Sequence, residues 1–323
     1  MYSGQQCPFA RSMNRSRGGS NSILKRLCII CLLLSLALLG GCAGFQPAQY
    51  ATFSVRARPH DQLAAASVHV NGLSVRAGDI VLGERGTAAS VFLALLAEEF
   101  FPFVHSGVVA IENGHAYVYE AFATIRPRLS GPPTDAIRGR IRRVTLERFM
   151  SRQQIAAIYA PPSEVDADAV AQFARDRYLD GTPFDAYFDA RDHRALYCNE
   201  FVALALSAGG AAPLDLVPIR TNASLAVVLK WLKVDTEGVI PAGALVGESQ
   251  RIATLSRSYT PEQVEAYFAA KRELHARFTD DQRLGNVFRW SPLGLRLRPA
   301  VKRYMTAKIA RAPDRHARDL AAH

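Results

Sequence analysis

Cys198 is the side chain best placed for nucleophilic chemistry, because the residue pattern predicts that a helix begins at it. Phe201, Leu204 and Ala208 recur at helical spacing after it, and Gly209-Gly210 ends the pattern. The free N–H groups and the positive dipole end of a helix N-terminus favour a thiolate. A thiolate with an imidazole in reach is a candidate nucleophile–base pair.

The cysteine count points to the same residue. Cys7, Cys28 and Cys31 lie in an N-terminal segment, and Cys42 lies at its end. This is neither a disulfide framework nor the spacing of a thiolate metal site. Cys198 is therefore the only thiol of the predicted folded domain, where it is either buried and inert or reactive.

Strand pairing predicts a base with its own orienting group. Two β-rich runs, 104–111 and 116–122, flank Asn113-Gly114, a dipeptide that favours a type I′ turn because both central residues need positive φ. In that register His105 and Glu120 are diagonal neighbours on one face of the hairpin. Imidazole and carboxylate can bridge such a separation.

These residues define a predicted catalytic trio. Cys198 would be the nucleophile, His105 the base and later the acid, and Glu120 the group that orients the imidazole. The backbone N–H of Cys198 would face the developing oxyanion. His193, five residues before the cysteine, is a competing base without an evident orienting partner, and Tyr187 and Tyr197 are candidate pocket residues.

The elements that must position this trio are strands and amphipathic helices in an α+β arrangement. Residues 67–70 and 73–76 are expected to form a hairpin, and 78–82 a buried strand. Helices are expected over 87–101, 166–179, 198–208 and 260–278, and further strands over 138–145 and 155–159. We expect an antiparallel sheet packed against helices.

The N-terminal segment predicts export and a lipid anchor. Lys25-Arg26 precedes an apolar run, 27–39, that is too short for an ordinary transmembrane span and suits a signal-peptide core. Leu39-Gly40-Gly41-Cys42 looks like a bacterial lipobox, in which the cysteine is acylated; the alternative is an ordinary secretory signal. Counted from Met13, the signal has a more usual length. We expect a bacterial cell-envelope protein, lipid-anchored at Cys42, on the periplasmic face of a membrane, the outer membrane being favoured.

The whole chain divides into four segments that differ in composition. Residues 1–41 are interpreted as the signal peptide, 42–65 as a tether, 66–250 as the catalytic domain and 251–323 as a basic helical extension. The extension could attach to an anionic surface or be a solvated helix with a loose tail.

The 49% apolar and 21% charged residues are those of a globular protein. No zinc-finger, basic-zipper or aromatic RNA-binding signature is present, so nucleic acid is not an expected partner.

Five motifs, in this order, resemble those of the YaeF/YiiX-type permuted papain-like amidases, circularly permuted relatives of the NlpC-type cell-wall hydrolases. They cover roughly residues 75–210: Gly78-Asp79-Ile80-Val81, Val104-His105-Ser106-Gly107-Val108-Val109, Val118-Tyr119-Glu120-Ala121, Pro183-Phe184-Asp185-Ala186-Tyr187-Phe188 and Leu196-Tyr197-Cys198-Asn199-Glu200-Phe201-Val202. The resemblance implies a papain-like fold with histidine before cysteine in the chain. It places the catalytic roles on Cys198, His105 and Glu120. Asn199 departs from the serine usual at that position.

The resemblance implies amide hydrolysis through an acyl-enzyme, with a peptidoglycan stem peptide or a related envelope amide as substrate. Related permuted enzymes with an Asn-Cys-Glu-like sequence act on lipids, so lipid hydrolysis or acyl transfer is an alternative. A non-catalytic envelope-binding module is a third. No metal or cofactor is implied.

Overall fold

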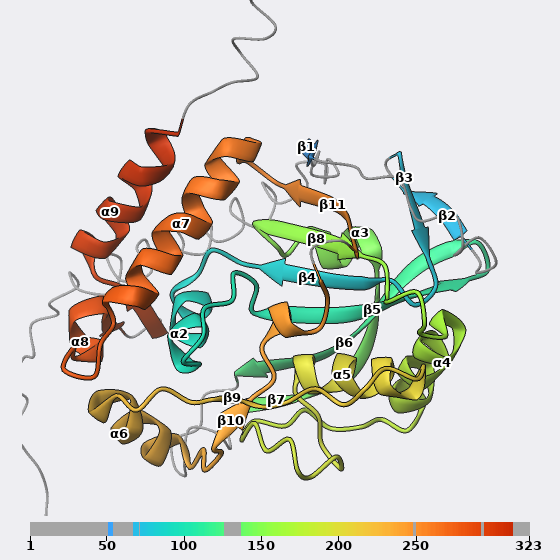
Figure 1. Ribbon diagram of the computed structural model, residues 1–323, viewed down its shortest axis with the longest axis horizontal. Coiled ribbons are helices and arrows are strands. Elements are labelled where there is room, and N and C mark those ends of the chain that lie inside the picture. The colour runs from blue at the N-terminus through green and yellow to red at the C-terminus, as the bar shows by residue number, and fades with distance from the viewer. Residues whose placement is uncertain are drawn as a thin grey trace, which may run out of the picture. The chain divides into compact units, whose positions relative to one another are not determined.

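A computed structural model of the 323-residue chain describes residues 51–53, 67–70, 72–125, 137–247, 250–291 and 294–312. These residues belong to one compact unit, Gln49–His323 (Figure 1). The predicted signal peptide, 1–41, and Cys42 lie outside the described residues. Of the predicted tether, 42–65, only Ala51–Phe53 is described, and it forms a strand.

The centre of the fold is an antiparallel sheet. Within the described residues it has seven strands in the order β1-β11-β8-β4-β5-β6-β7, and every neighbouring pair is antiparallel. The strands are β1 (Ala51–Phe53), β4 (Ile80–Glu84), β5 (His105–Glu112), β6 (His115–Ile125), β7 (Ile137–Thr145), β8 (Ile155–Tyr159) and β11 (Arg251–Ser256). The predicted α+β class with an antiparallel sheet is confirmed.

Helices and small hairpins surround this sheet. The helices are α2 (Ala88–Leu96), α3 (Leu146–Met150), α4 (Ala167–Leu179), α5 (Cys198–Ala208), α6 (Ala223–Leu232), α7 (Pro261–Arg277), α8 (Leu284–Val287), α9 (Pro299–Ala310) and the 3-10 turn η4 (Ala242–Ala244). The outer strands pair as β2 (Ser67–Val70) with β3 (Leu73–Arg76), β9 (Val217–Pro218) with β10 (Gly238–Val239), and β12 (Phe288–Ser291) with β13 (Gly294–Leu297). None of the helices in the described part of the chain is long and apolar enough to cross a membrane.

Apolar residues bury both faces of the sheet, because successive side chains of a strand point to opposite sides. On β5, Val108 and Ala110 join the core beneath α4 and α5, whereas Val109 joins the core on the side of α3 and the β2–β3 hairpin. The larger core includes Phe201 of α5 and Val170 of α4. Figure 1 shows α4 and α5 running along the β5–β7 part of the sheet.

The β5–β6 hairpin has the predicted register. Asn113 and Gly114 have φ values of 50° and 77°, as a type I′ turn requires. Glu112 pairs with His115, and the same register continues to Val108 opposite Tyr119.

Two features of the chain differ from the expected elements. The helix expected over 87–101 ends at Leu96, because Ala97 is extended and forms a bridge to Ile219. The sheet also continues beyond residue 250, the predicted end of the catalytic domain, since β11 lies between β1 and β8. Part of the segment expected to be an extension is thus built into the central sheet.

Candidate active site

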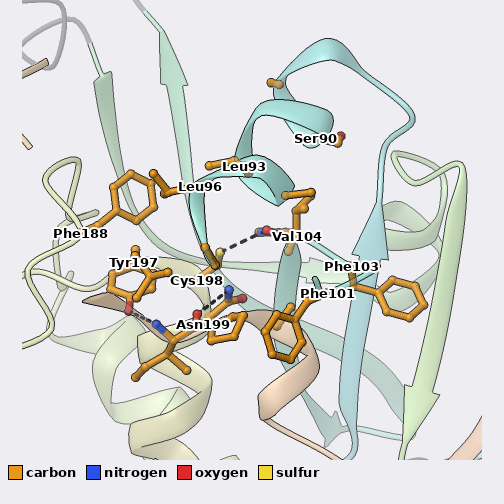
Figure 2. A pocket seen from close by; sticks show the side chains of 18 of the residues that line it. Ser90, Leu93, Leu96, Phe101, Phe103, Val104, Phe188, Tyr197, Cys198 and Asn199 are labelled. Carbon is orange, nitrogen blue, oxygen red and sulfur yellow. Dashed lines mark hydrogen bonds between the residues drawn. The ribbon is translucent and has the colours of Figure 1, made fainter. Parts of the chain in front are cut away.

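Cys198 is the first residue of α5, as the sequence predicts. The Glu200 side chain caps the start of the helix, since its carboxylate accepts from the Tyr197 backbone N–H at 3.3 Å. The partly exposed thiol of Cys198 approaches the carbonyl oxygen of Val104 at 3.9 Å (Figure 2). The first N–H groups of a helix have no partner within the helix, so those of α5 are available beside the thiol.

His105 begins β5 and lies next to Cys198 at one cavity. Its Nε2 lies 2.5 Å from Oε2 of Glu120, and its ring stacks on Phe149 of α3 with centroids 5.8 Å apart. Burial alone would lower the pKa of His105, but hydrogen bonds and charges from Cys198 and Glu120 outweigh it and raise the pKa to about 9. Because Nε2 is engaged by Glu120, Nδ1 is the ring nitrogen left to serve the thiol.

Glu120 is fully buried and surrounded by cations. Its Oε1 accepts from Nε of Arg142 at 2.8 Å and from Arg152 at 3.2 Å, while Oε2 holds His105. Burial would raise the pKa of Glu120, but these partners, with His105 foremost, lower it below the ordinary carboxyl value. The carboxylate therefore stays charged and fixes the imidazole ring.

Asn199, the departure from the resembled motif, ties α5 to its surroundings. Its Oδ1 accepts from the Ser106 hydroxyl at 2.8 Å, and its Nδ2 donates to the carbonyl of Ile240 at 2.9 Å. Ser106 follows His105 on β5, and its hydroxyl also lies 3.0 Å from the Cys198 carbonyl. The amide thus connects the strand of the histidine to the helix of the cysteine.

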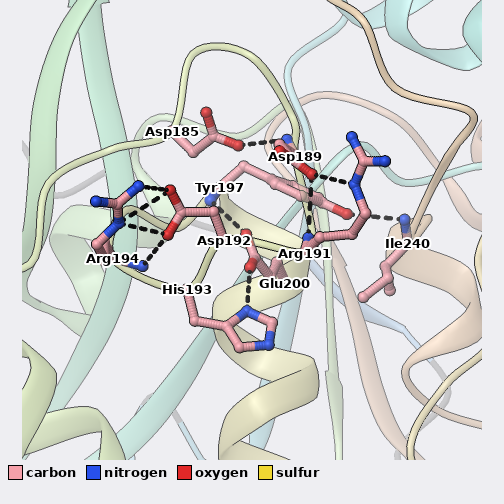
Figure 3. Close-up of polar contacts among 9 residues, drawn as sticks. All are labelled: Asp185, Asp189, Arg191, Asp192, His193, Arg194, Tyr197, Glu200 and Ile240. Atoms are coloured by element: carbon pink, nitrogen blue, oxygen red, sulfur yellow. Dashed lines mark hydrogen bonds and ion pairs between the residues drawn. The ribbon is translucent and has the colours of Figure 1, made fainter.

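His193, the competing base, has a different partner. Its Nδ1 lies 2.8 Å from Oε1 of Glu200. A dashed line marks this contact in Figure 3. Burial raises the pKa of Glu200 to about 7, against hydrogen bonds from His193 and the Tyr197 backbone. Nearly half of the His193 side chain is exposed, at 48%. It does not line the cavity that contains Cys198 and His105.

The cavity next to Cys198 has a volume of about 280 Å³ and mostly apolar walls. Leu93 and Leu96 of α2 face it from one side and Phe101, Phe103 and Val104 from another (Figure 2). Further apolar walls come from Phe184, Phe188, Val239 and Ile240. Such walls suit an aliphatic or aromatic part of a ligand.

The two predicted pocket tyrosines have different positions. Tyr197 lines the cavity, and its hydroxyl accepts from the Ile240 N–H at 2.9 Å. Tyr187 is 40% exposed and lies outside the lining. Phe188 takes the place expected for Tyr187: it packs 5.2 Å from the Tyr197 ring and has a φ of 58°. A positive φ at a bulky residue has no sequence signal, so the pattern could not distinguish Phe188 from its neighbour.

Groups of three or more metal-ligating side chains are not found within the described residues.

No family model and no curated protein sequence matches the chain. Among solved structures, the crystal structure of metalloprotein yiiX from Escherichia coli O157:H7 is similar at 16% identity and a TM-score of 0.42, covering 55% of this chain and 94% of that one.

Proposed function

We propose that this protein is a cysteine hydrolase of the permuted papain-like type, acting through Cys198, His105 and Glu120. The observation that carries the proposal is the series of contacts from the thiol at the first residue of α5 to an imidazole and then to a buried carboxylate, at the wall of one cavity. A charged imidazole beside a thiol favours the thiolate, which is the nucleophilic form.

The proposed reaction proceeds through a thioester. The Cys198 sulfur attacks the carbonyl carbon, and backbone N–H groups at the start of α5 stabilise the oxyanion. The tetrahedral intermediate then collapses, and His105 gives its proton to the departing amine or alcohol. His105 next takes a proton from water, which attacks the thioester, releases the acid and restores the thiol–imidazole pair.

Thiol labelling tests the proposed trio. We expect iodoacetamide to modify Cys198 faster in the native protein than in the unfolded chain. This fast labelling should be lost in Cys198→Ser and strongly slowed in His105→Ala. His193→Ala is the matched control, because it removes the other histidine–glutamate pair near α5 and should leave the rate unchanged. Equal rates in native and unfolded protein would point to the non-catalytic binding module instead.

The substrate class has two candidates. The sequence resemblance favours an amide of a peptidoglycan stem peptide or a related envelope amide. The apolar cavity walls favour the second, an acyl lipid that Cys198 hydrolyses or whose acyl group it transfers. Mass spectrometry of the protein after exposure to muropeptides or to phospholipid separates them, since the mass added at Cys198 identifies the acyl group.

We further propose that acylation of Cys42 anchors the protein at the periplasmic face of a membrane. The support is the lipobox-like ending Leu39-Gly40-Gly41-Cys42 of the sequence. Cys42→Ala should move the protein from the membrane fraction to the soluble fraction, whereas Cys31→Ala, a control within the same segment, should not. Membrane association of Cys42→Ala would mean that another feature, such as the basic C-terminal segment, suffices.

A further inference from the structure

Positive charge is concentrated beside the proposed active site. The Phe122 ring lies next to His105, with centroids 6.4 Å apart. Three guanidinium groups surround that ring: Arg142, Arg85 and Arg152, whose central carbons lie 3.1, 5.0 and 5.5 Å from its centroid. Glu120 neutralises part of this charge through Arg142 and Arg152.

Arg85 differs from the other two arginines. It follows β4 and lines the cavity together with His105 and Cys198. Across the described part of the chain, the Arg85 side chain has no hydrogen bond or ion pair, and its guanidinium lies over the Phe122 ring. Its side chain is partly exposed, so the guanidinium donors remain available to a ligand in the cavity.

Arg85 and the apolar walls fit two parts of one ligand. An aliphatic chain fits walls such as Leu93, Leu96 and Phe188, and a guanidinium recognises a carboxylate or phosphate with paired hydrogen bonds. An acidic peptide would use Arg85 but would leave this apolar surface unmatched. The observations therefore favour an amphiphile over a polar peptide.

We propose that Arg85 binds the anionic group of an acyl amphiphile whose chain occupies the apolar cavity. This inference rests on the proposed function for the role of the neighbouring thiol, but the binding itself needs no thiol chemistry. Arg85 would thus select among substrates by charge, whereas Cys198 and His105 act on the acyl carbonyl.

Equilibrium binding to the full-length Cys198→Ala protein tests the proposal without turnover. The probes are a dansyl-labelled fatty acid and its neutral methyl ester, with a lysophospholipid phosphate monoester and a short acidic peptide as competitors. We expect the carboxylate to bind about tenfold tighter than the ester, and the preference to weaken with added salt. The phosphate monoester should compete and the peptide should not.

The decisive comparison is among arginine variants of that protein. Arg85→Gln should remove the preference for the anionic probe, and Arg85→Lys should retain part of it. Arg148→Gln is the matched control, because Arg148 is exposed, influences Arg152 and does not line the cavity. Each variant is first checked by its unfolding curve.

An undiminished preference in Arg85→Gln, or none in the parent protein, would overturn the proposed role of Arg85. Arg85-dependent competition by the acidic peptide, equal to that of the fatty acid, would replace the amphiphile by a peptide ligand. Failure of the proposed hydrolase would show elsewhere, as loss of the native-state labelling advantage of Cys198.

Discussion

Replacing Glu120 by glutamine tests how the proposed active site controls the charge of His105. The substitution keeps the shape of the side chain and removes its charge. His105 then loses its anionic partner at 2.5 Å, and Arg142 and Arg152 lose their shared counter-charge. Both changes disfavour the imidazolium.

The expected magnitude follows from the pKa of His105. A rise from 6.5 to about 9 corresponds to about 3 kcal/mol in favour of the imidazolium. Cys198 and Glu120 both contribute to this rise. Because burial opposes this rise, the two partners together contribute more than the net change. With about half of that contribution from Glu120, Glu120→Gln lowers the pKa of His105 by at least about one, and uncompensated repulsion from the two arginines lowers it further.

Histidine titration by NMR, with carbon-13-labelled histidine, measures the effect. The His105 signal is assigned by its absence in His105→Ala, and its titration belongs to the coupled Cys198–His105 pair. Glu200→Gln is the matched control, because it changes the carboxylate that contacts His193 and should not move the His105 midpoint. A midpoint still near 9 in Glu120→Gln would refute the assigned role of Glu120.

The same pKa predicts how stability depends on pH. Because the pKa of His105 is raised in the folded protein, its contribution is complete below about 6.5 and is lost as pH rises through about 9. Urea unfolding across this window should therefore show a smaller loss of stability in Glu120→Gln than in the parent. An equal pH dependence in both proteins would contradict the linkage.

Two further substitutions probe the framework of the site. Lys271→Met should cost about 3–5 kcal/mol of unfolding free energy, because it leaves the fully buried Glu84 without its cation at 2.5 Å. The double variant with Glu84→Gln should recover part of that loss, as measured by urea unfolding. Gly107→Ala should cost about 1–3 kcal/mol, since a Cβ there would lie 2.6 Å from Cγ1 of Val118, whereas Gly285→Ala, with no atom within 4 Å, should change thermal stability by less than about 0.5 kcal/mol. A stable Lys271→Met protein, or equal effects of the two alanine substitutions, would contradict these assignments.

The contact between His105 and Glu120 was predictable because one local rule determines it. Asn113-Gly114 selects the turn, the turn selects the register, and the two-residue period of a strand then brings the two side chains together. The start of α5 at Cys198 was equally local, since apolar spacing and Gly209-Gly210 define that helix.

The partners of that pair were not predictable in the same way. Arg142 reaches Glu120 because β7 pairs with β6, and Arg152 reaches it from the turn after α3. Neither pairing is encoded in the few residues around each arginine. The buried role of Asn199 likewise depends on Ser106 and Ile240, which are distant in sequence, so composition around the cysteine could not reveal it.

The region after residue 250 contributes to the geometry of the candidate site. Lys271 of α7 contacts Glu84 and also donates to the carbonyl of Pro102 at 2.8 Å. Glu84 and Pro102 lie on either side of the pairing between β4 and the start of β5. There Gly83 pairs with His105, and the Val104 N–H donates to the Gly83 carbonyl. The buried ammonium of Lys271 therefore holds in place both Glu84, which precedes Arg85, and Pro102, which shortly precedes His105.

This arrangement predicts the outcome of cutting the chain at the sequence-based boundary. A protein that ends at residue 250 loses Lys271 and leaves a buried carboxylate at Glu84, and it also exposes the edge of β8 that β11 covers. We expect it to expose apolar surface and to lose the native labelling rate of Cys198, whereas a protein that ends at residue 312, after α9, should keep both. Native labelling in the shorter protein would mean that the catalytic unit is complete without α7 and β11.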